Sequence, residues 1–282
     1  MTKTLSLEGK TVLITGGSRG IGFATAQAAL KRGARVVLAA RDELQLEAAA
    51  RRLGGARGQV FVQQMDVTDE HMVCRAIDAI LATAGAIDVL INNAGGATQG
   101  LFADLPMIAI EDEINLDYLG PLRVLKAVLP HMRERGQGTV VNIASALGFV
   151  AYPTMANYSA AKAAVARVTE ALEFELRSDG IDVLLFVPGH TATDAIKKLK
   201  LEGPPVVKPE VVGEHIIAAV CARRRFAVHG SGNKMLLLIS RLWPWYARYI
   251  LRYMALRSLP PGTFGTPRER GRTRPALERA KE

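Results

Sequence analysis

A glycine-rich turn near the start of the chain joins an apolar segment to an alanine-rich one. Residues 11–15 (TVLIT) have the composition of a short buried strand, and residues 23–32 have that of a helix. Between them, Gly16, Gly20 and Gly22 allow a tight turn and a close approach of the backbone to an anion at the helix N-terminus. An ordinary turn between a strand and a helix is the alternative. The pattern predicts the phosphate-binding entry of a dinucleotide-binding fold.

The rest of the chain alternates in the same way between short apolar segments and longer helical ones. Such alternation predicts an α/β fold with parallel strands. Right-handed connections then give a Rossmann-like doubly wound parallel β-sheet with helices on both faces and ligands at its carboxyl edge. The predicted strands span residues 11–15, 35–40, 60–65, 89–92, 139–143, 182–187 and 225–229, and the predicted helices include 43–53, 70–84, 108–133 and 155–178.

Tyr158 and Lys162 are four residues apart, so they share one face of a helix. A cation near a phenol favours the phenolate, and we predict that Lys162 lowers the pKa of Tyr158 from its usual value of about 10. Ser145 follows an apolar segment, where a strand end would present its hydroxyl. A tyrosine and a lysine at this spacing also occur by chance on surface helices. The three side chains therefore become a candidate proton-transfer site only if a cofactor site lies beside them.

Several motifs between residues 11 and 193 support such a cofactor site. In chain order they are TGGSRGIG at 15–22, NNAG at 92–95, the set Asn115, Ser145, Tyr158 and Lys162, and Pro188-Gly189 followed by Thr193. With these motifs the chain resembles the short-chain dehydrogenase/reductase family, and the four separate residues fall on that family's catalytic tetrad.

The resemblance implies a nicotinamide dinucleotide cofactor and hydride transfer between a carbonyl and a hydroxyl carbon. It implies that Tyr158 donates a proton to the carbonyl oxygen, that Ser145 hydrogen-bonds this oxygen, and that Lys162 holds the nicotinamide ribose. By the same resemblance, Asn115 anchors a water chain that resupplies protons. The implied cofactor-binding residues are Gly16, Ser18, Arg19, Gly20, Ile21, Gly22, Arg41, Asp66, Val67, Asn93, Ala94, Gly95, Tyr158, Lys162, Pro188, Gly189, Thr191 and Thr193.

The end of the second predicted strand indicates which dinucleotide binds. An acidic side chain usually holds the ribose hydroxyls of NAD at this point, but Ala40 stands there in this chain. Arg41 follows it and Arg19 lies in the glycine-rich turn, so two guanidinium groups suit a 2′-phosphate. Asp42 is expected to cap the next helix. We therefore predict NADP(H), and the alternative is that Arg41 is only a solvated surface charge.

Length and cysteine content agree with one intracellular domain. The chain's 282 residues are enough for a large α/β domain. Its two cysteines, Cys74 and Cys221, give no disulfide framework and no metal-binding pattern, which is typical of a reducing compartment. Neither a signal peptide nor a membrane-spanning apolar stretch is evident. We expect a cytoplasmic protein without a bound metal, which can lie peripherally at a membrane surface.

Basic and aromatic residues gather at the C-terminal end. Residues 223–282 contain fourteen Lys or Arg against three Glu, a surplus of eleven that exceeds the chain's formal net charge of +9. Both tryptophans, Trp243 and Trp245, lie there, and Pro244 suits the first turn of a helix. A basic amphipathic segment with such aromatics favours peripheral membrane contact through residues 235–258. A dimer partner or the chain's own substrate pocket are the alternatives, and nucleic acid is not expected.

The chain is predicted to have three parts. We expect a catalytic domain over residues 1–230 with a substrate loop at 190–209, a helical extension at 231–260, and a flexible tail at 261–282. His190 in this loop lines the pocket or is an ordinary loop histidine. Lys197, Lys198 and Lys200 attract an anionic substrate or are only solvated.

The extension suggests the type of substrate. It is similar to those of hydroxysteroid dehydrogenases and ketosphinganine reductases, which implies a small lipophilic ketone of steroid, sphingoid or acyl type. The family resemblance also implies a homodimer or homotetramer. The main hypothesis is an NADP(H)-dependent reductase of a lipophilic carbonyl. The alternative is a non-enzymatic, NADP-sensing protein that binds a membrane or a partner.

Overall fold

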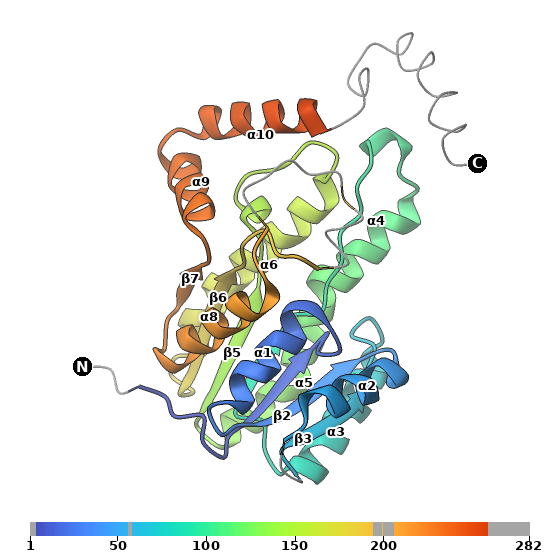
Figure 1. The fold of residues 1–282 in the computed structure, drawn as a ribbon, viewed down its shortest axis with the longest axis vertical. Coiled ribbons are helices and arrows are strands. Elements are labelled where there is room, and N and C mark those ends of the chain that lie inside the picture. The colour runs from blue at the N-terminus through green and yellow to red at the C-terminus, as the bar shows by residue number, and fades with distance from the viewer. Residues whose placement is uncertain (1–3, 56–57, 194–198, 200–205, 259–282) are drawn as a thin grey trace.

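A parallel sheet forms the centre of the molecule. The computed structural model describes residues 4–55, 58–193, 199 and 206–258, so Lys197, Lys198, Lys200 and the predicted tail at 261–282 lie outside the described residues. Within the described part, seven strands pair in the order β3-β2-β1-β4-β5-β6-β7 (Figure 1). They are β1 (Thr11–Thr15), β2 (Arg35–Ala40), β3 (Val60–Gln64), β4 (Val89–Asn92), β5 (Gly138–Ile143), β6 (Ile181–Val187) and β7 (Phe226–Val228), each within one residue of its prediction at either end.

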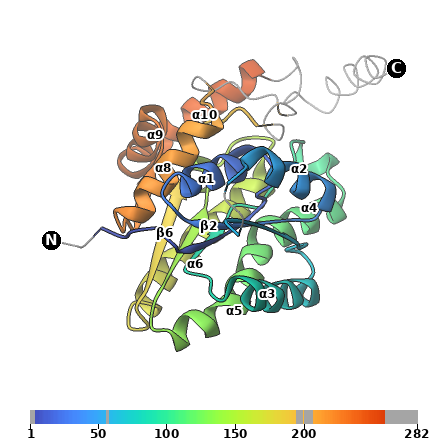
Figure 2. The same cartoon turned by 60° about the horizontal axis from the view of Figure 1, so that its bottom comes forward.

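Helices cover both faces of the sheet, which confirms the predicted doubly wound fold (Figure 2). One face packs against α1 (Gly20–Leu30), α2 (Glu43–Leu53) and α8 (Pro209–Cys221), and the other against α3 (Glu70–Ala84), α5 (Gly120–Glu134) and α6 (Ala156–Glu175). Adjacent strand residues such as Leu13 and Ile14 therefore enter opposite cores. This is why the strands carry apolar side chains at consecutive positions rather than at every second one.

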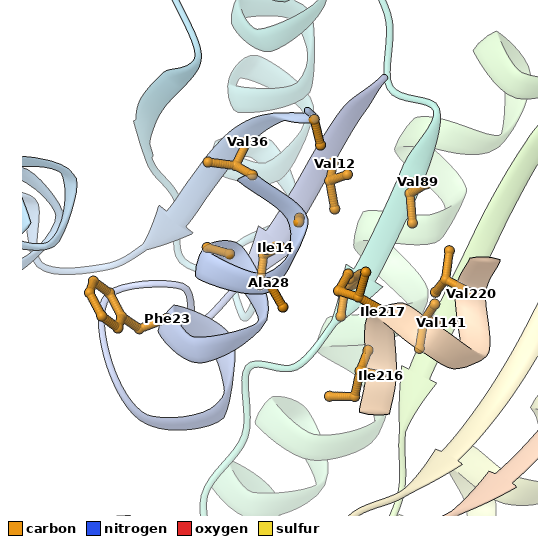
Figure 3. Close-up of a cluster of buried hydrophobic side chains, with 14 of the residues drawn as sticks. Val12, Ile14, Phe23, Ala28, Val36, Val89, Val141, Ile216, Ile217 and Val220 are labelled. Carbon is orange, nitrogen blue, oxygen red and sulfur yellow. The ribbon is translucent and has the colours of Figure 1, made fainter. Parts of the chain in front are cut away.

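The core between α1, α8 and the sheet anchors the glycine-rich turn (Figure 3). Val12 and Ile14 of β1 and Ile216 and Val220 of α8 are 0% exposed. Burial of each such side chain contributes about 1.5–3 kcal/mol relative to an exposed one. The glycine-rich turn therefore begins directly after a strand that is held in place by dense packing.

The long helix predicted over residues 108–133 has a wide turn inside it. The structure divides this stretch into α4 (Met107–Ile114), a π-helical turn η2 (Asn115–Leu119) and α5, which begins at Gly120. A π-helical turn rotates the side chains that follow it relative to a regular helix, and such turns often occur at functional sites. Here it places Asp117 in the interior, where the residue is 0% exposed.

Two helices follow the last strand and lie beyond the carboxyl edge of the sheet (Figure 1). They are α9 (Ser231–Leu242) and α10 (Pro244–Ser258), and Pro244 begins the second helix as predicted. Ala247, Leu251 and Ala255 recur every four residues and are buried against Val150, Tyr152 and Met155. The opposite side of α10 is exposed. None of the described helices is long and apolar enough to cross a bilayer.

Candidate active site

A cavity of about 550 Å³ opens at the carboxyl ends of the strands. Here the chain crosses from one side of β1 to the other, which is where doubly wound folds bind ligands. Three of the predicted site residues, Gly22, Asp66 and Asn115, do not line the cavity. The predicted residues that line it are Gly16, Ser18, Arg19, Gly20, Ile21, Arg41, Val67, Asn93, Ala94, Gly95, Ser145, Tyr158, Lys162, Pro188, Gly189, Thr191 and Thr193.

The glycine-rich turn brings backbone N–H groups to one end of the cavity. Helix α1 begins at Gly20, and Arg19 before it is extended and makes no side-chain cap, so an anion can occupy the helix N-terminus. Gly22 does not line the cavity but allows close packing beneath the turn. A Cβ on Gly22 would collide with the carbonyl group of Gly16, so only glycine allows the helix to start this close to the turn.

The loop after β4 is tied to the same turn. The side-chain amide of Asn93 donates to the Thr15 carbonyl oxygen at 2.9 Å, and the backbone N–H groups of Asn93 and Ala94 donate to Thr15 Oγ1 at 3.0 Å. On the far side, a Cβ on Gly20 would lie 3.2 Å from the Thr193 methyl group, so the segment after β6 also reaches the turn. These contacts hold three loops around one binding surface.

The end of β2 presents Arg41 to the cavity beside Asp42, whose carboxylate is engaged in capping the next helix. Arg41 lines the cavity, and the carboxylate of Asp42 accepts hydrogen bonds from Gln45 N at 3.0 Å and Gln45 Nε2 at 2.7 Å. Asp42 thus caps α2, as predicted. Asp66 likewise bonds within its own turn, to Thr68 N at 2.9 Å and Thr68 Oγ1 at 2.7 Å. The surface from the glycine-rich turn to Arg41 therefore fits a nicotinamide dinucleotide.

Ser145, Tyr158 and Lys162 meet at the other end of the cavity. Ser145 follows β5, and its side chain is hydrogen-bonded to Tyr158 in the first turn of α6. Lys162 Nζ lies 5.7 Å from the centre of the Tyr158 ring and 3.5 Å from the carbonyl oxygen of Ile143. Only 7% of the lysine side chain is exposed. The group places a hydroxyl donor, a phenol and a buried ammonium against one cavity wall.

The pKa of Tyr158 is raised, so the predicted lowering is wrong. Desolvation of the phenol is the main cause of the higher pKa. The ammonium of Lys162 and the hydrogen bond with Ser145 lower the pKa, but these effects do not prevail. Asp117 and Glu113 raise it further, because nearby negative charge disfavours the phenolate. The tyrosine is therefore held in its protonated form.

Asp117, not Asn115, contacts the lysine. Asp117 Oδ1 lies 2.9 Å from Lys162 Nζ, whereas Asn115 Oδ1 is buried with no hydrogen-bond partner in the described part of the chain. The role that the resemblance implies for Asn115, anchoring a water chain, is a separate one and stays a prediction. Residues two apart on a helix point in different directions, so only one of the two side chains can face α6. Asp117 was not predicted as a site residue, because nothing in the local pattern reveals which of the two side chains faces α6.

Apolar residues from the C-terminal helices complete the cavity. Leu236 of α9 and Leu251 and Met254 of α10 line it together with Tyr152 and Met155, and His190 lines it after β6. Of these residues, only His190 was considered from the sequence as a possible part of the pocket. The spacing of Ala247, Leu251 and Ala255 at every fourth position is a signal that could have indicated a buried face on α10, but it does not indicate what that face covers.

Comparisons with known proteins agree with this geometry. A family model described as short chain dehydrogenase matches residues 10–202. The chain is 30% identical over 263 residues to the ketoacyl reductase HetN of Nostoc sp., covering 89% of this chain and 91% of the relative. It is 30% identical over 271 residues to dehydrogenase/reductase SDR family member 7B of Danio rerio, covering 90% and 87%. A solved gluconate 5-dehydrogenase from Burkholderia cenocepacia J2315, in complex with NADP and tartrate, has a TM-score of 0.75 and 27% identity over 81% of this chain and 96% of that one.

Proposed function

Because this chain belongs to the short-chain dehydrogenase/reductase family, we propose that it is an NADP(H)-dependent reductase of a lipophilic ketone. Members of this family are oxidoreductases that act on CH–OH groups with a nicotinamide cofactor. The observation that carries the proposal is one cavity with a phosphate-binding turn at one end and Ser145, Tyr158 and Lys162 at the other. The chemistry that a bound nicotinamide supplies there is hydride transfer.

The protein side chains manage the proton and the position of the carbonyl. In reduction, Tyr158 donates its proton to the carbonyl oxygen, and Ser145 hydrogen-bonds the same oxygen while negative charge develops on it. Lys162 lies beside the Tyr158 ring, and the family resemblance supports a contact between this lysine and the cofactor ribose. A protonated Tyr158 is the form that reduction requires, and cells generally keep NADP reduced. Both points support the reducing direction.

The preference for NADP(H) is inferred from charge. Arg19 and Arg41 both line the cavity, Ala40 stands where an NAD enzyme usually carries an acid, and Asp42 is engaged with its own helix. A guanidinium group can bind a phosphate with two parallel hydrogen bonds. The gluconate 5-dehydrogenase structure, which contains NADP, is consistent with this preference.

The lipophilic substrate is inferred from the opposite wall. Met155, Leu236, Leu251 and Met254 present hydrocarbon and thioether groups to the cavity near Tyr158. Such a lining gains free energy by removing apolar substrate surface from water, by about 25 cal/mol per Å². A ketoacyl reductase among the relatives favours an acyl ketone within the wider steroid, sphingoid or acyl class.

A steady-state assay of NADPH oxidation tests the proposal. We expect kcat/KM to rise with the apolar length of a series of 3-ketoacyl thioesters, and NADPH to be used in preference to NADH. Arg41→Ala is expected to raise the KM for NADPH about tenfold or more and to leave the KM for NADH nearly unchanged, because a charge-assisted hydrogen bond contributes about 1.5–3 kcal/mol.

Arg51→Ala is the matched control for this assay. Arg51 is an exposed arginine on α2 that pairs with Glu47 at 3.4 Å and does not line the cavity. Its replacement removes the same charge and should leave the KM values for NADPH and NADH unchanged. Equal use of NADH and NADPH by the wild type would contradict the cofactor assignment. If NADPH bound but no ketone of the acyl, steroid or sphingoid type were reduced, the non-enzymatic alternative would be favoured.

We also propose that the outer face of α9 and α10 contacts an anionic membrane surface. Trp243, Trp245 and Tyr249 are 53–65% exposed on this face, a large exposure for aromatic side chains. Arg241, Arg248, Arg252 and Arg257 lie in the same two helices, and neither helix contains an acidic residue. Aromatic rings beside arginines suit the interface of a bilayer with anionic lipids. A lipophilic substrate could then reach the cavity directly from the bilayer.

Co-sedimentation with vesicles tests this contact. We expect the protein to pellet with vesicles containing phosphatidylserine more than with pure phosphatidylcholine. Replacing Trp245 and Tyr249 by serine should weaken the binding at least about tenfold, because two interfacial rings are lost. Leu44→Ser is the control, since Leu44 is 78% exposed on α2, away from α10 (Figure 1). Equal pelleting of the wild type and the double variant would refute the membrane contact.

A further inference from the structure

Two buried carboxylates lie behind the lysine of the proposed site. Asp117 is in the π-helical turn η2, and Glu113 is four residues earlier in the last turn of α4. Glu113 is 5% exposed and Asp117 is 0% exposed. Buried carboxylates are costly unless they are paired, so both require an explanation.

Asp117 is held from two sides. Its Oδ1 lies 2.9 Å from Lys162 Nζ, and its oxygens accept longer hydrogen bonds of 3.3 and 3.4 Å from the Gly96 N–H group. The pair therefore joins α6 to the loop after β4, which lines the cofactor surface. Burial by itself would lower the pKa of Lys162, but the carboxylate of Asp117 raises it, so the lysine stays charged.

Glu113 adds negative charge to the same cluster. Its Oε1 accepts a hydrogen bond of 2.6 Å from the Thr98 N–H group, while its Oε2 is buried and has no hydrogen-bond partner among the described residues. Burial, together with repulsion from Asp117, raises the pKa of Glu113. A protonated Glu113 can donate from the second oxygen, and an ionised one adds to the charge that faces Tyr158.

The charge of Asp117 changes what Lys162 does to the phenol. An ammonium alone favours the phenolate. When the ammonium is paired at 2.9 Å with a carboxylate, the two charges largely cancel, so their combined effect on the Tyr158 phenol is small. The other groups around the phenol are Ser145 after β5, Glu113 from α4 and, in the same cavity, His190 after β6. The side chains of α10 that line the cavity are the uncharged Leu251 and Met254.

We propose that Asp117 is a positioning residue that neutralises Lys162 and so sets the pH range in which Tyr158 can donate a proton. The inference rests on the proposed function, because it concerns the same proton donor. Asp117 leaves the equilibrium between ketone and alcohol unchanged. Asp117 extends to more alkaline pH the range in which the phenol keeps its proton. It acts through Lys162 and does not touch the substrate.

The pH dependence of an Asp117→Asn variant tests this role. The amide has nearly the same size but no charge. We expect the alkaline limb of kcat/KM for reduction to move to lower pH by about one unit or more, since a nearby charge shifts a pKa by about 1–3 units. The limb of the reverse oxidation should move by the same amount, because both report the same proton. Asp112→Asn, which removes an exposed charge from α4, should move neither limb.

A second variant and a direct measurement keep the test decisive. Glu113→Gln should move the limbs in the same direction by less, because Glu113 is not paired with Lys162, and it serves if Asp117→Asn does not fold. Tyrosinate absorbance, taken as the difference from Tyr158→Phe in each background, assigns the proton to Tyr158 and requires no substrate. If the wild type reduced none of the ketones tested, this result would refute the proposed function but not the role of Asp117. The role of Asp117 would be overturned if the folded variants showed the same pH profiles of kcat/KM and the same tyrosinate titration as the wild type.

Discussion

A Tyr158→Phe variant is expected to reduce ketones with a kcat/KM about 10³-fold below that of the wild type, because a positioned general acid typically contributes about 10²- to 10⁴-fold. The substitution removes only the hydroxyl that is hydrogen-bonded to Ser145 and faces the cavity. The ring that lies beside Lys162 remains. The carbonyl oxygen then lacks its proton donor, while the binding surface for the cofactor is preserved.

Cofactor binding and a second tyrosine distinguish this result from misfolding. Fluorescence titration should give the same Kd for NADPH in wild type and Tyr158→Phe, and only kcat should fall. Tyr249→Phe, which removes a phenol hydroxyl from the exposed side of α10, should retain full activity. A Tyr158→Phe variant that kept more than a tenth of the wild-type rate would show that another group delivers the proton.

The sheet could be predicted because its signals are local. Strands such as β1 and β2 are short apolar runs between turns, and a continuous apolar run of this length is typical of a strand that is buried on both faces. The need for glycine in the glycine-rich turn is local as well, since Gly22 packs against the Gly16 carbonyl group within the same seven residues. Here sequence neighbours are also spatial neighbours.

The charge partner of Lys162 could not be predicted in the same way. Asn115 and Asp117 lie in one helical stretch, and each residue there is compatible with a helix. Which side chain faces Lys162 depends on the π-helical turn, and that turn depends on packing against α6 and the loop after β4, far away in the sequence. The rise in the pKa of Tyr158 follows from the same tertiary contacts, so a local argument from Lys162 alone gave the wrong sign.

The C-terminal helices illustrate a further limit. Their amphipathic pattern and the helix start at Pro244 follow from sequence, but a membrane, a dimer partner and the chain's own pocket all suit an apolar face. The structure places Leu236 and Leu251 at the cavity, so the inner face covers the site. The exposed aromatic residues Trp243, Trp245 and Tyr249 do not line the cavity. Distinguishing the two faces required knowing where α10 lies on the fold.

The loop between β4 and α4 gives the second large prediction. Gly95 has no positive φ, so alanine is compatible with its backbone, but a Cβ there would lie 2.5 Å from Asp117 Oδ1 and 3.3 Å from Lys162 Nζ. The buried ion pair would have to move. We expect Gly95→Ala to lower kcat/KM about 10²-fold, because a displacement of about 1 Å in a catalytic constellation costs about that factor.

Gly96→Ala provides the comparison at the next residue of the same loop. Among the described residues, a Cβ on Gly96 would meet a methyl group of Leu116 alone, at the ordinary contact distance of 3.4 Å, and the N–H group that donates to Asp117 is kept. The activity of this variant should stay within about threefold of the wild type, because ordinary contacts require no displacement. Steady-state kinetics on both variants, with circular dichroism to establish folding, separates crowding of the ion pair from a general effect of alanine in this loop. Equal losses of kcat/KM in the two variants would mean that displacement of the Asp117–Lys162 ion pair is not the cause of the effect of Gly95→Ala.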